Sequence, residues 1–84
     1  MLKRGQDMIA AGDVAGARLL LVRVSDAGNA EASLTLGGTF DPDVLARLNA
    51  VGTRPDMAKA RVLYARAAEQ GSMEAKRRLD QSSR

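Results

Sequence analysis

Residues 13–36 read DVAGARLLLVRVSDAGNAEASLTL and residues 56–79 read DMAKARVLYARAAEQGSMEAKRRL, so one stretch occurs twice at an offset of 43 positions. Ten of the 24 aligned positions are identical, and the alignment needs no gap. A period between about 20 and 50 residues is typical of repeat arrays, in which each unit is one supersecondary element. We therefore expect an array, which serves as a surface for holding partners and carries no chemistry of its own.

Composition excludes several classes of function. The chain has 84 residues, enough for one core, and contains no Cys and no His. Disulfides, thiolate nucleophiles, imidazole bases and the usual zinc sites are therefore excluded. No segment approaches the roughly 20 apolar residues of a membrane span, so we expect no membrane insertion. The net charge of +3 permits acidic partners without requiring them.

The first copy opens with a helix signal. Asp13 can accept hydrogen bonds from the free amides of a first helical turn, which suits it to the N-cap position. Apolar residues then follow at spacings of three and four, which predicts one apolar stripe. They are Val14, Ala17, Leu20, Leu21, Val24 and Ala27. Gly28 and Asn29 tolerate a left-handed backbone, so we expect the helix to end there.

Similar signals along the chain predict an all-α fold. Five main helices are expected, over residues 2–11, 13–27, 30–38, 55–71 and 73–80. We expect Gly37 and Gly38 to stop the third of these. In the connection over 39–55, Asp41 before Pro42 is typical of an N-cap with proline at the first helical position. A short sixth helix is therefore expected in that connection.

Small residues and turn residues recur at similar spacings in the two copies. In the second copy they are Gly52 to Asp56, Lys59-Ala60, Tyr64, Ala67-Ala68, Gly71 and Glu74-Ala75, and in the first they are Gly12-Asp13, Ala17, Gly28 to Ala32 and Leu36-Gly37. This pattern resembles the Sel1-like repeat, a relative of the tetratricopeptide repeat. The first copy departs from it, with Leu21 in place of the family's tyrosine and Val24-Ser25 in place of its Ala-Ala pair.

The resemblance implies antiparallel helix-turn-helix repeats stacked as a short α-solenoid. It implies a single domain over 1–84, with units of about 1–29 and 30–72 and a terminal helix over 72–82. Members of the family are adaptors for protein assembly, frequently in bacterial signalling and cell-envelope systems. The expected partner is therefore another protein or peptide. The sequence leaves the compartment open: the isolated chain is expected in the cytoplasm, while a longer parent protein could be attached to the envelope.

Most of the recurring positions have a structural explanation. Helices that approach closely and chains that turn need small or apolar residues at fixed places, so packing alone accounts for them. We interpret the following as structural repeat positions: Asp13, Ala17, Leu20, Gly28, Ala32, Leu36, Asp56, Ala60, Leu63, Tyr64, Ala67, Gly71, Ala75 and Leu79.

The recurring arginines have two explanations. Arg18 recurs as Arg61, and Arg23 recurs as Arg66. They could form a basic ridge for an acidic ligand, or they could pair at helical spacing with Asp13, Asp26, Asp56 or Glu69. We favour the ion-paired or solvated face, because surface ion pairs are common and individually weak.

The densest positive cluster lies near the end of the chain, at Lys76, Arg77, Arg78 and Arg84. Cations are favourable near a helix C-terminus, which explains the cluster without a ligand. Nucleic-acid binding would need aromatic residues for base stacking, and the chain has only Phe40 and Tyr64. We therefore do not expect nucleic acid as a partner.

No catalytic set can be assembled from these residues. Asp41 and Asp43 are close in sequence, but the first is interpreted as a helix cap and the second as an acidic residue of the first turn. A nucleophile with a base would need His or Cys, and no phosphate loop of the Walker type occurs. We expect no enzyme activity, no cofactor and no metal.

The resemblance also implies a binding face. In the family the first helix of each pair lines the concave side, and here its exposed residues would be Gln6, Glu31, Glu74, Arg77 and Gln81. We expect these residues to contact the partner. The alternative is a structural role, either capping a larger solenoid or self-association into a homo-oligomer. Exposure of Leu2, Ile9 and Leu79 would favour that alternative.

Overall fold

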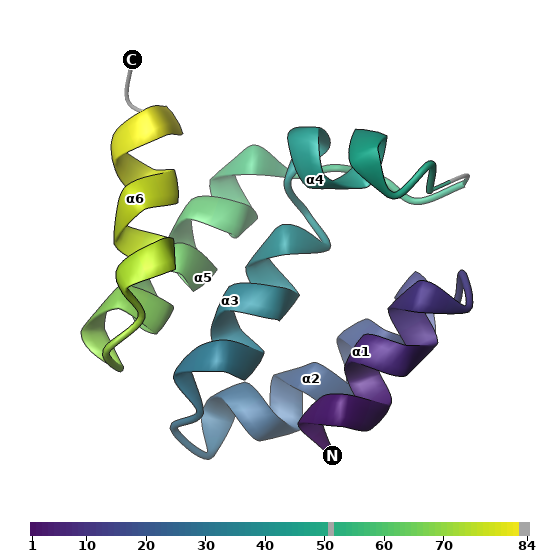
Figure 1. Ribbon diagram of the computed structural model, residues 1–84, viewed down its shortest axis with the longest axis horizontal. Coiled ribbons are helices and arrows are strands. Elements are labelled where there is room, and N and C mark those ends of the chain that lie inside the picture. The colour runs from purple at the N-terminus through teal and green to yellow at the C-terminus, as the bar shows by residue number, and fades with distance from the viewer. Residues whose placement is uncertain (51, 83–84) are drawn as a thin grey trace.

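The computed structural model describes residues 1–50 and 52–82, and these residues form six helices (Figure 1). The helices are α1 (Leu2–Ala10), α2 (Val14–Asp26), α3 (Ala30–Gly38), α4 (Pro42–Arg47), α5 (Met57–Glu69) and α6 (Met73–Ser82). The described residues contain no strand. The predicted all-α fold is confirmed, and α4 is the short helix expected in the connection over 39–55.

Capping side chains set the starts of α2 and α5, whereas α1 has no side-chain cap among the described residues. Asp13 Oδ1 accepts the Gly16 amide at 2.9 Å, and Asp56 Oδ1 accepts the Lys59 amide at 3.1 Å. The predicted end of α2 just before Gly28 and Asn29 is confirmed, but Asn29 is not left-handed. Its φ is −81° and its side chain accepts the Ala32 amide, so it caps α3 instead. An Asn side chain satisfies a free helix amide well, whereas the reversal of the chain needs only one left-handed residue.

That left-handed residue is a glycine in both copies. Gly28 has a φ of +100° and Gly71 has a φ of +111°. A side chain is strained in this region of backbone space, which explains why glycine stands at the same place in each copy.

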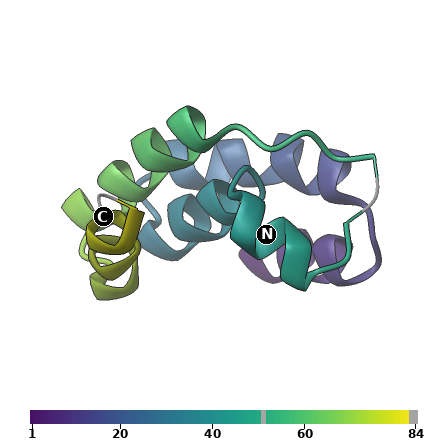
Figure 2. The same ribbon diagram turned by 90° about the horizontal axis from the view of Figure 1, so that it is seen from above.

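The helices alternate between two layers (Figures 1 and 2). Helices α1, α3 and α6 form one layer, and α2 with α5 forms the other. Each main helix packs on the next, so that α1 contacts α2, α2 contacts α3, α3 contacts α5, and α5 contacts α6. The molecule measures 28 × 28 × 16 Å, which makes it a thin disc with two broad faces.

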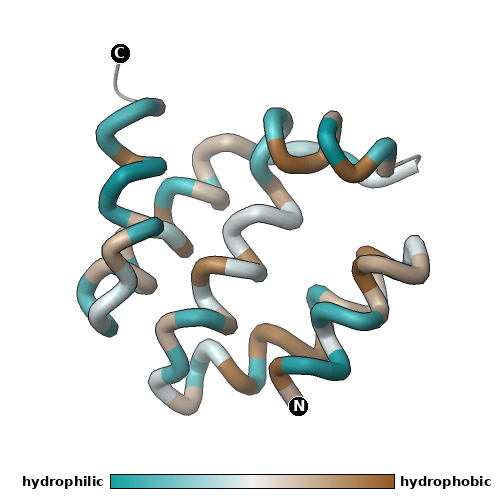
Figure 3. The backbone as a smooth tube through the Cα atoms, in the orientation of Figure 1, coloured by the Kyte–Doolittle hydropathy of each residue, from teal (hydrophilic) through white to brown (hydrophobic). Residues whose placement is uncertain are grey.

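The core divides into two apolar clusters. One joins α2, α3 and α5 through Ala17, Leu21, Ala32, Leu36 and Leu63. The other joins α5 and α6 through Ala60, Tyr64, Ala67 and Ala75. Figure 3 shows that α6 is otherwise largely hydrophilic, so this helix buries a narrow stripe and exposes most of its surface.

The two copies pack by the same contact. A methyl group added at Gly5 of α1 would lie 2.7 Å from Leu21, and one added at Gly37 of α3 would lie 2.8 Å from the ring of Tyr64. Leu21 and Tyr64 are 43 positions apart, so they are the same position of the repeat. In each copy a glycine therefore lets a helix approach the large side chain of the next helix.

This contact corrects the expected role of Gly37 and Gly38. Helix α3 does end at Gly38, as predicted, but neither glycine has the positive φ of a glycine that reverses the chain, and both are buried. Thr39 is the C-cap residue, and its hydroxyl donates a hydrogen bond of 2.6 Å to the carbonyl of Leu36. Close packing between helices, rather than chain reversal, explains the glycine at position 37.

The structure places the structural repeat positions in four environments. Eight are buried, namely Ala17, Ala32, Leu36, Ala60, Leu63, Tyr64, Ala67 and Ala75. Asp13 and Asp56 cap helices, and Gly28 and Gly71 make the turns. Leu20 and Leu79 are only half-buried. Leu79 packs at the edge of the second cluster, whereas Leu20 lines an open groove between α1 and α2.

Candidate functional site

A polar hollow of about 320 Å³ lies between α4 and α6, at the start of α5. Figure 1 shows the first turns of α5 between these two helices. The hollow is lined by Asp41, Asp43 and Arg47 of the α4 region, Met57 of α5, and Glu74, Arg77, Arg78 and Gln81 of α6. We call this the α4–α6 hollow. Its lining contains three carboxylates and three guanidinium groups, so it presents charges of both signs.

A buried hydrogen-bond network forms the base of the hollow. The Tyr64 hydroxyl donates to Asp41 Oδ2 at 2.8 Å, and Arg78 Nη1 donates to the Tyr64 oxygen at 3.3 Å. Asp41 also caps α4 by accepting the Asp43 amide at 2.9 Å. Burial, reinforced by the hydrogen bond to Asp41, raises the pKa of Tyr64 to about 12. This network connects α4, α5 and α6 and so fixes the shape of the hollow.

On α6 the charged side chains are already ordered. Glu74 Oε1 accepts from Arg77 Nε at 3.0 Å, and Glu74 Oε2 accepts from Arg78 Nε at 3.1 Å. The hydrogen bond from Arg77 is the main cause that holds the pKa of Glu74 below its usual value. Side chains that are held in place lose less conformational freedom when a partner binds.

Across the hollow, the charged side chains of Asp43 and Arg47 in α4 are not ion-paired with any described residue. Arg47 and Asp43 make no side-chain ion pair within the parts of the chain that are described. Their charged groups are free to pair with a partner. The hollow thus combines charged groups on α6 that are held by hydrogen bonds to one another with unpaired charged groups on α4.

The structure brings together three of the five residues predicted for the binding face. Glu74, Arg77 and Gln81 all line the α4–α6 hollow. Gln6 is half-buried on α1, and Glu31 is exposed in the first turn of α3, outside the lining of the hollow. The predicted face is therefore concentrated on α6 rather than spread along three helices.

Sequence reasoning missed Arg78 and the α4 residues of the hollow. From the sequence, Arg78 belongs only to a basic cluster, although its spacing from Glu74 places both on one face of a helix. Asp41 and Asp43 were predicted only as residues of the helix start. They do occupy those positions, and they also line the hollow. Arg84, the last residue of the predicted basic cluster, lies outside the described residues.

The recurring arginines do not behave as a repeated set. Arg18 donates to Thr39 Oγ1 at 3.2 Å and to the Arg54 carbonyl at 3.1 Å, and its Cζ lies 3.8 Å from the centre of the Phe40 ring. Burial lowers the pKa of Arg18. It therefore clamps the connection after α3, and neither an intrahelical ion pair nor a basic ridge describes it. Arg66 pairs with Asp26 of α2 at 3.0 Å, across helices rather than along one.

The described residues form neither a metal centre nor a membrane span. Within residues 1–50 and 52–82, no group of three or more Cys, His, Asp or Glu side chains is arranged to hold a metal ion. In the same part of the chain, no helix has both the length and the apolar character that crossing a membrane needs.

The described chain thus defines an all-helical protein with six helices and a polar hollow on one side. Comparisons with protein-family models, with curated proteins and with solved structures found no match to this chain.

Proposed function

We propose that this chain is a non-catalytic protein-interaction module, built as a short Sel1-like α-solenoid that holds another protein or peptide. The repeat of 43 residues supports the solenoid, together with the contacts Gly5–Leu21 and Gly37–Tyr64 that recur with it. The alternation of helices between two layers also supports it. In this role the chain needs no catalytic group, cofactor or metal.

The α4–α6 hollow is the observation that carries the binding role. It holds ordered charges on α6 and unpaired charges on α4, and it lies over a buried network that keeps its shape. A polar segment with charges of both signs fits such a surface, because each charge then finds an opposite one. We propose a protein or peptide segment of this kind as the partner.

A peptide selection tests this role and needs no identified partner. Random peptides displayed on phage are selected against the whole chain, and the affinity of a recovered peptide is measured by fluorescence anisotropy. We expect Arg47→Glu and Arg77→Glu each to weaken binding about tenfold, as removal of a central contact does. Glu31→Lys is the matched control, since Glu31 is exposed and lies outside the hollow. Binding that survives both hollow variants would remove the proposal.

Capping or self-association is the second candidate, favoured by exposed apolar side chains. Leu19 is 77% exposed, Val62 is 63% exposed and Met73 is 79% exposed. The residues expected to favour this role, Leu2, Ile9 and Leu79, are instead half-buried against the core clusters. Light scattering over a range of concentrations and at two salt levels measures the molar mass and so tests self-association. A stable monomer would exclude self-association, and a concentration-dependent dimer would support it.

A further inference from the structure

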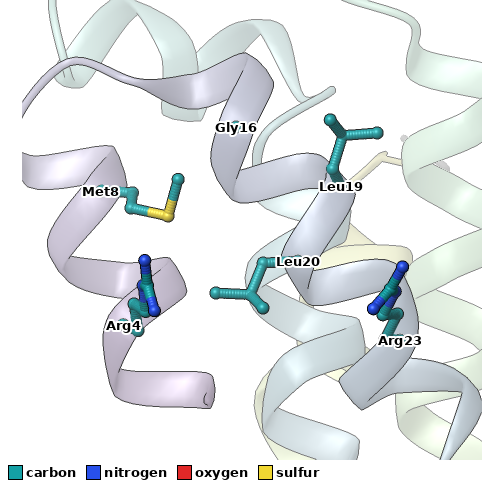
Figure 4. Close-up of a pocket in the computed structure, with 6 residues that line it drawn as sticks. All are labelled: Arg4, Met8, Gly16, Leu19, Leu20 and Arg23. Carbon is teal, nitrogen blue, oxygen red and sulfur yellow. The ribbon is translucent and has the colours of Figure 1, made fainter.

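The groove between α1 and α2 has an apolar floor and basic edges. It measures about 330 Å³ and is lined by Arg4 and Met8 of α1 and by Gly16, Leu19, Leu20 and Arg23 of α2. Figure 4 shows Met8 and Leu20 pointing toward one another across the gap, with Arg4 on one helix and Arg23 on the other. We call this the α1–α2 groove.

The second copy of the repeat shows how the same positions are used when a helix covers them. Leu63, the equivalent of Leu20, is only 7% exposed because it packs against α2 and α3. Arg66, the equivalent of Arg23, pairs with Asp26 of α2 at 3.0 Å and donates to Ser25 Oγ at 3.3 Å. Helix α5 therefore binds its neighbour by an apolar contact together with an arginine–carboxylate pair.

In the first copy, Leu20 and Arg23 have no equivalent partners within the described residues. Leu20 is half-buried and faces the groove, and Leu19 beside it is 77% exposed. The guanidinium groups of Arg4 and Arg23 make no hydrogen bond or ion pair with any residue in 1–50 and 52–82. The lining of the groove contains no acidic residue. Two unpaired cations beside an apolar strip favour an anionic, partly apolar occupant.

We propose that the α1–α2 groove docks an amphipathic helix of another protein that carries carboxylates beside its apolar stripe. A helix fits because its side-chain ridge packs into the groove between two others, as α5 packs on α3 and inserts Leu63 into the cluster formed by α2 and α3. The carboxylates would pair with Arg4 and Arg23, as Asp26 pairs with Arg66. A symmetric contact with a second copy of the chain would instead bring four unpaired arginines together, and like charges oppose such a contact. This site is separate from the α4–α6 hollow and does not depend on it.

A designed peptide tests the proposal. The probe is an amphipathic helical peptide of about 18 residues, or about five turns, with leucines on one face and glutamates beside them. A matched peptide has glutamine at each glutamate position. We expect the glutamate peptide to bind the whole chain about fivefold more tightly, since two exposed ion pairs contribute modestly. The preference is expected to shrink as salt is added.

Variants of the chain locate the binding. We expect the double variant Arg4→Glu with Arg23→Glu to reverse the preference between the two peptides, and Leu19→Asp to weaken both about tenfold. Val62→Asp is the matched control, because Val62 is the equivalent exposed position on α5 and lies outside the groove. All four positions are exposed, so the variants should keep the helical circular-dichroism signal of the parent chain.

Two results would overturn the proposal. One is binding of the glutamate peptide that the groove variants leave unchanged, and in particular binding that only Arg77→Glu in the α4–α6 hollow abolishes. The other is a dimer in light scattering that Leu19→Asp dissociates while neither peptide binds, since a second copy would then occupy the groove. Loss of peptide binding at the groove would leave the test of the α4–α6 hollow unaffected, so the two failures can be told apart.

Discussion

Helices α2 and α5 come from the two copies of the repeat and are each 13 residues long, yet they bury the residues they share to different degrees. Leu63 of α5 lies in the core at 7% exposure, whereas Leu20 of α2 is half-buried in an open groove. Arg66 pairs across helices, whereas Arg23 does not. The position of a residue in the repeat thus determines which face of the helix it occupies. The helix packed against that face determines how much the residue contributes to stability.

The largest expected difference between the two helices comes from truncating their equivalent leucines. Leu63→Ala should lower the free energy of unfolding by about 2–5 kcal/mol, since it leaves a cavity in the core. Leu20→Ala should lower it by about 1 kcal/mol, because part of that side chain is already in water. Urea denaturation followed by circular dichroism measures both values. Equal losses would mean that the groove is closed in solution.

The next comparison concerns Tyr64 of α5 and the pH dependence that its burial creates. The pKa of Tyr64 is raised to about 12, while that of an unfolded tyrosine is about 10. The folded protein therefore favours the neutral phenol. The stability from this preference is complete below about pH 10 and is lost as the pH rises through about 12. A difference of about two pKa units corresponds to about 3 kcal/mol.

Denaturation curves taken between about pH 9 and about pH 12.5 check this expectation. The equivalent position of α2 is Leu21, which does not titrate, so the effect belongs to the second copy alone. Tyr64→Phe is the control and should lack this part of the alkaline loss. Tyr64 is the single tyrosine of the chain, so phenolate absorbance reports its ionisation directly. Ionisation of the folded protein near the unfolded pKa of about 10 would contradict the burial of this hydroxyl.

The glycines that face Leu21 and Tyr64 give a smaller difference. Gly37→Ala would place a methyl group 2.8 Å from the Tyr64 ring and 3.2 Å from Leu63 Cβ. The ring is held by its hydrogen bond to Asp41, so we expect a loss of about 1–3 kcal/mol in the free energy of unfolding.

Gly5→Ala is the matched change in the first copy. Its methyl group would meet the end of the Leu21 side chain at 2.7 Å, and that end can rotate. The better helix propensity of alanine, about 1 kcal/mol, acts in both variants, and here it should offset most of the smaller cost. Thermal unfolding of both variants measures the difference. A larger loss for Gly5→Ala would mean that Leu21 is held as rigidly as Tyr64.

These comparisons also explain what could be predicted from the sequence. The helices, the Asp caps and the glycine turns follow from interactions within a few residues, so the sequence predicted them closely. The α4–α6 hollow depends on contacts between distant segments, such as Tyr64 with Asp41. Of its lining, only the α6 residues Glu74, Arg77 and Gln81 could be predicted as contacts, because the resemblance assigned that helix to the binding face.

Arg18 is the clearest case of a residue whose role could not be predicted. Its identity with Arg61 suggested one role for both, but its contacts lie on Thr39, Phe40 and Arg54. Those residues belong to the connection over 39–55, which lies outside both copies of the repeat. A repeat alignment therefore carries no information about these contacts.

The smallest expected difference between α2 and α5 is that of their two caps, which should behave alike. Asp13→Ala and Asp56→Ala each remove one hydrogen bond to a first-turn amide, at 2.9 Å and 3.1 Å respectively. Each should lower the free energy of unfolding by about 1 kcal/mol. The cap acts within its own turn and does not depend on which helix packs alongside, so the two losses should agree and should add in the double variant. A much larger loss at one cap, measured by urea denaturation, would show that the start of that helix also takes part in packing. Equivalent positions of the two copies would then differ in packing from the first residue onward, and not only from Leu20 and Leu63.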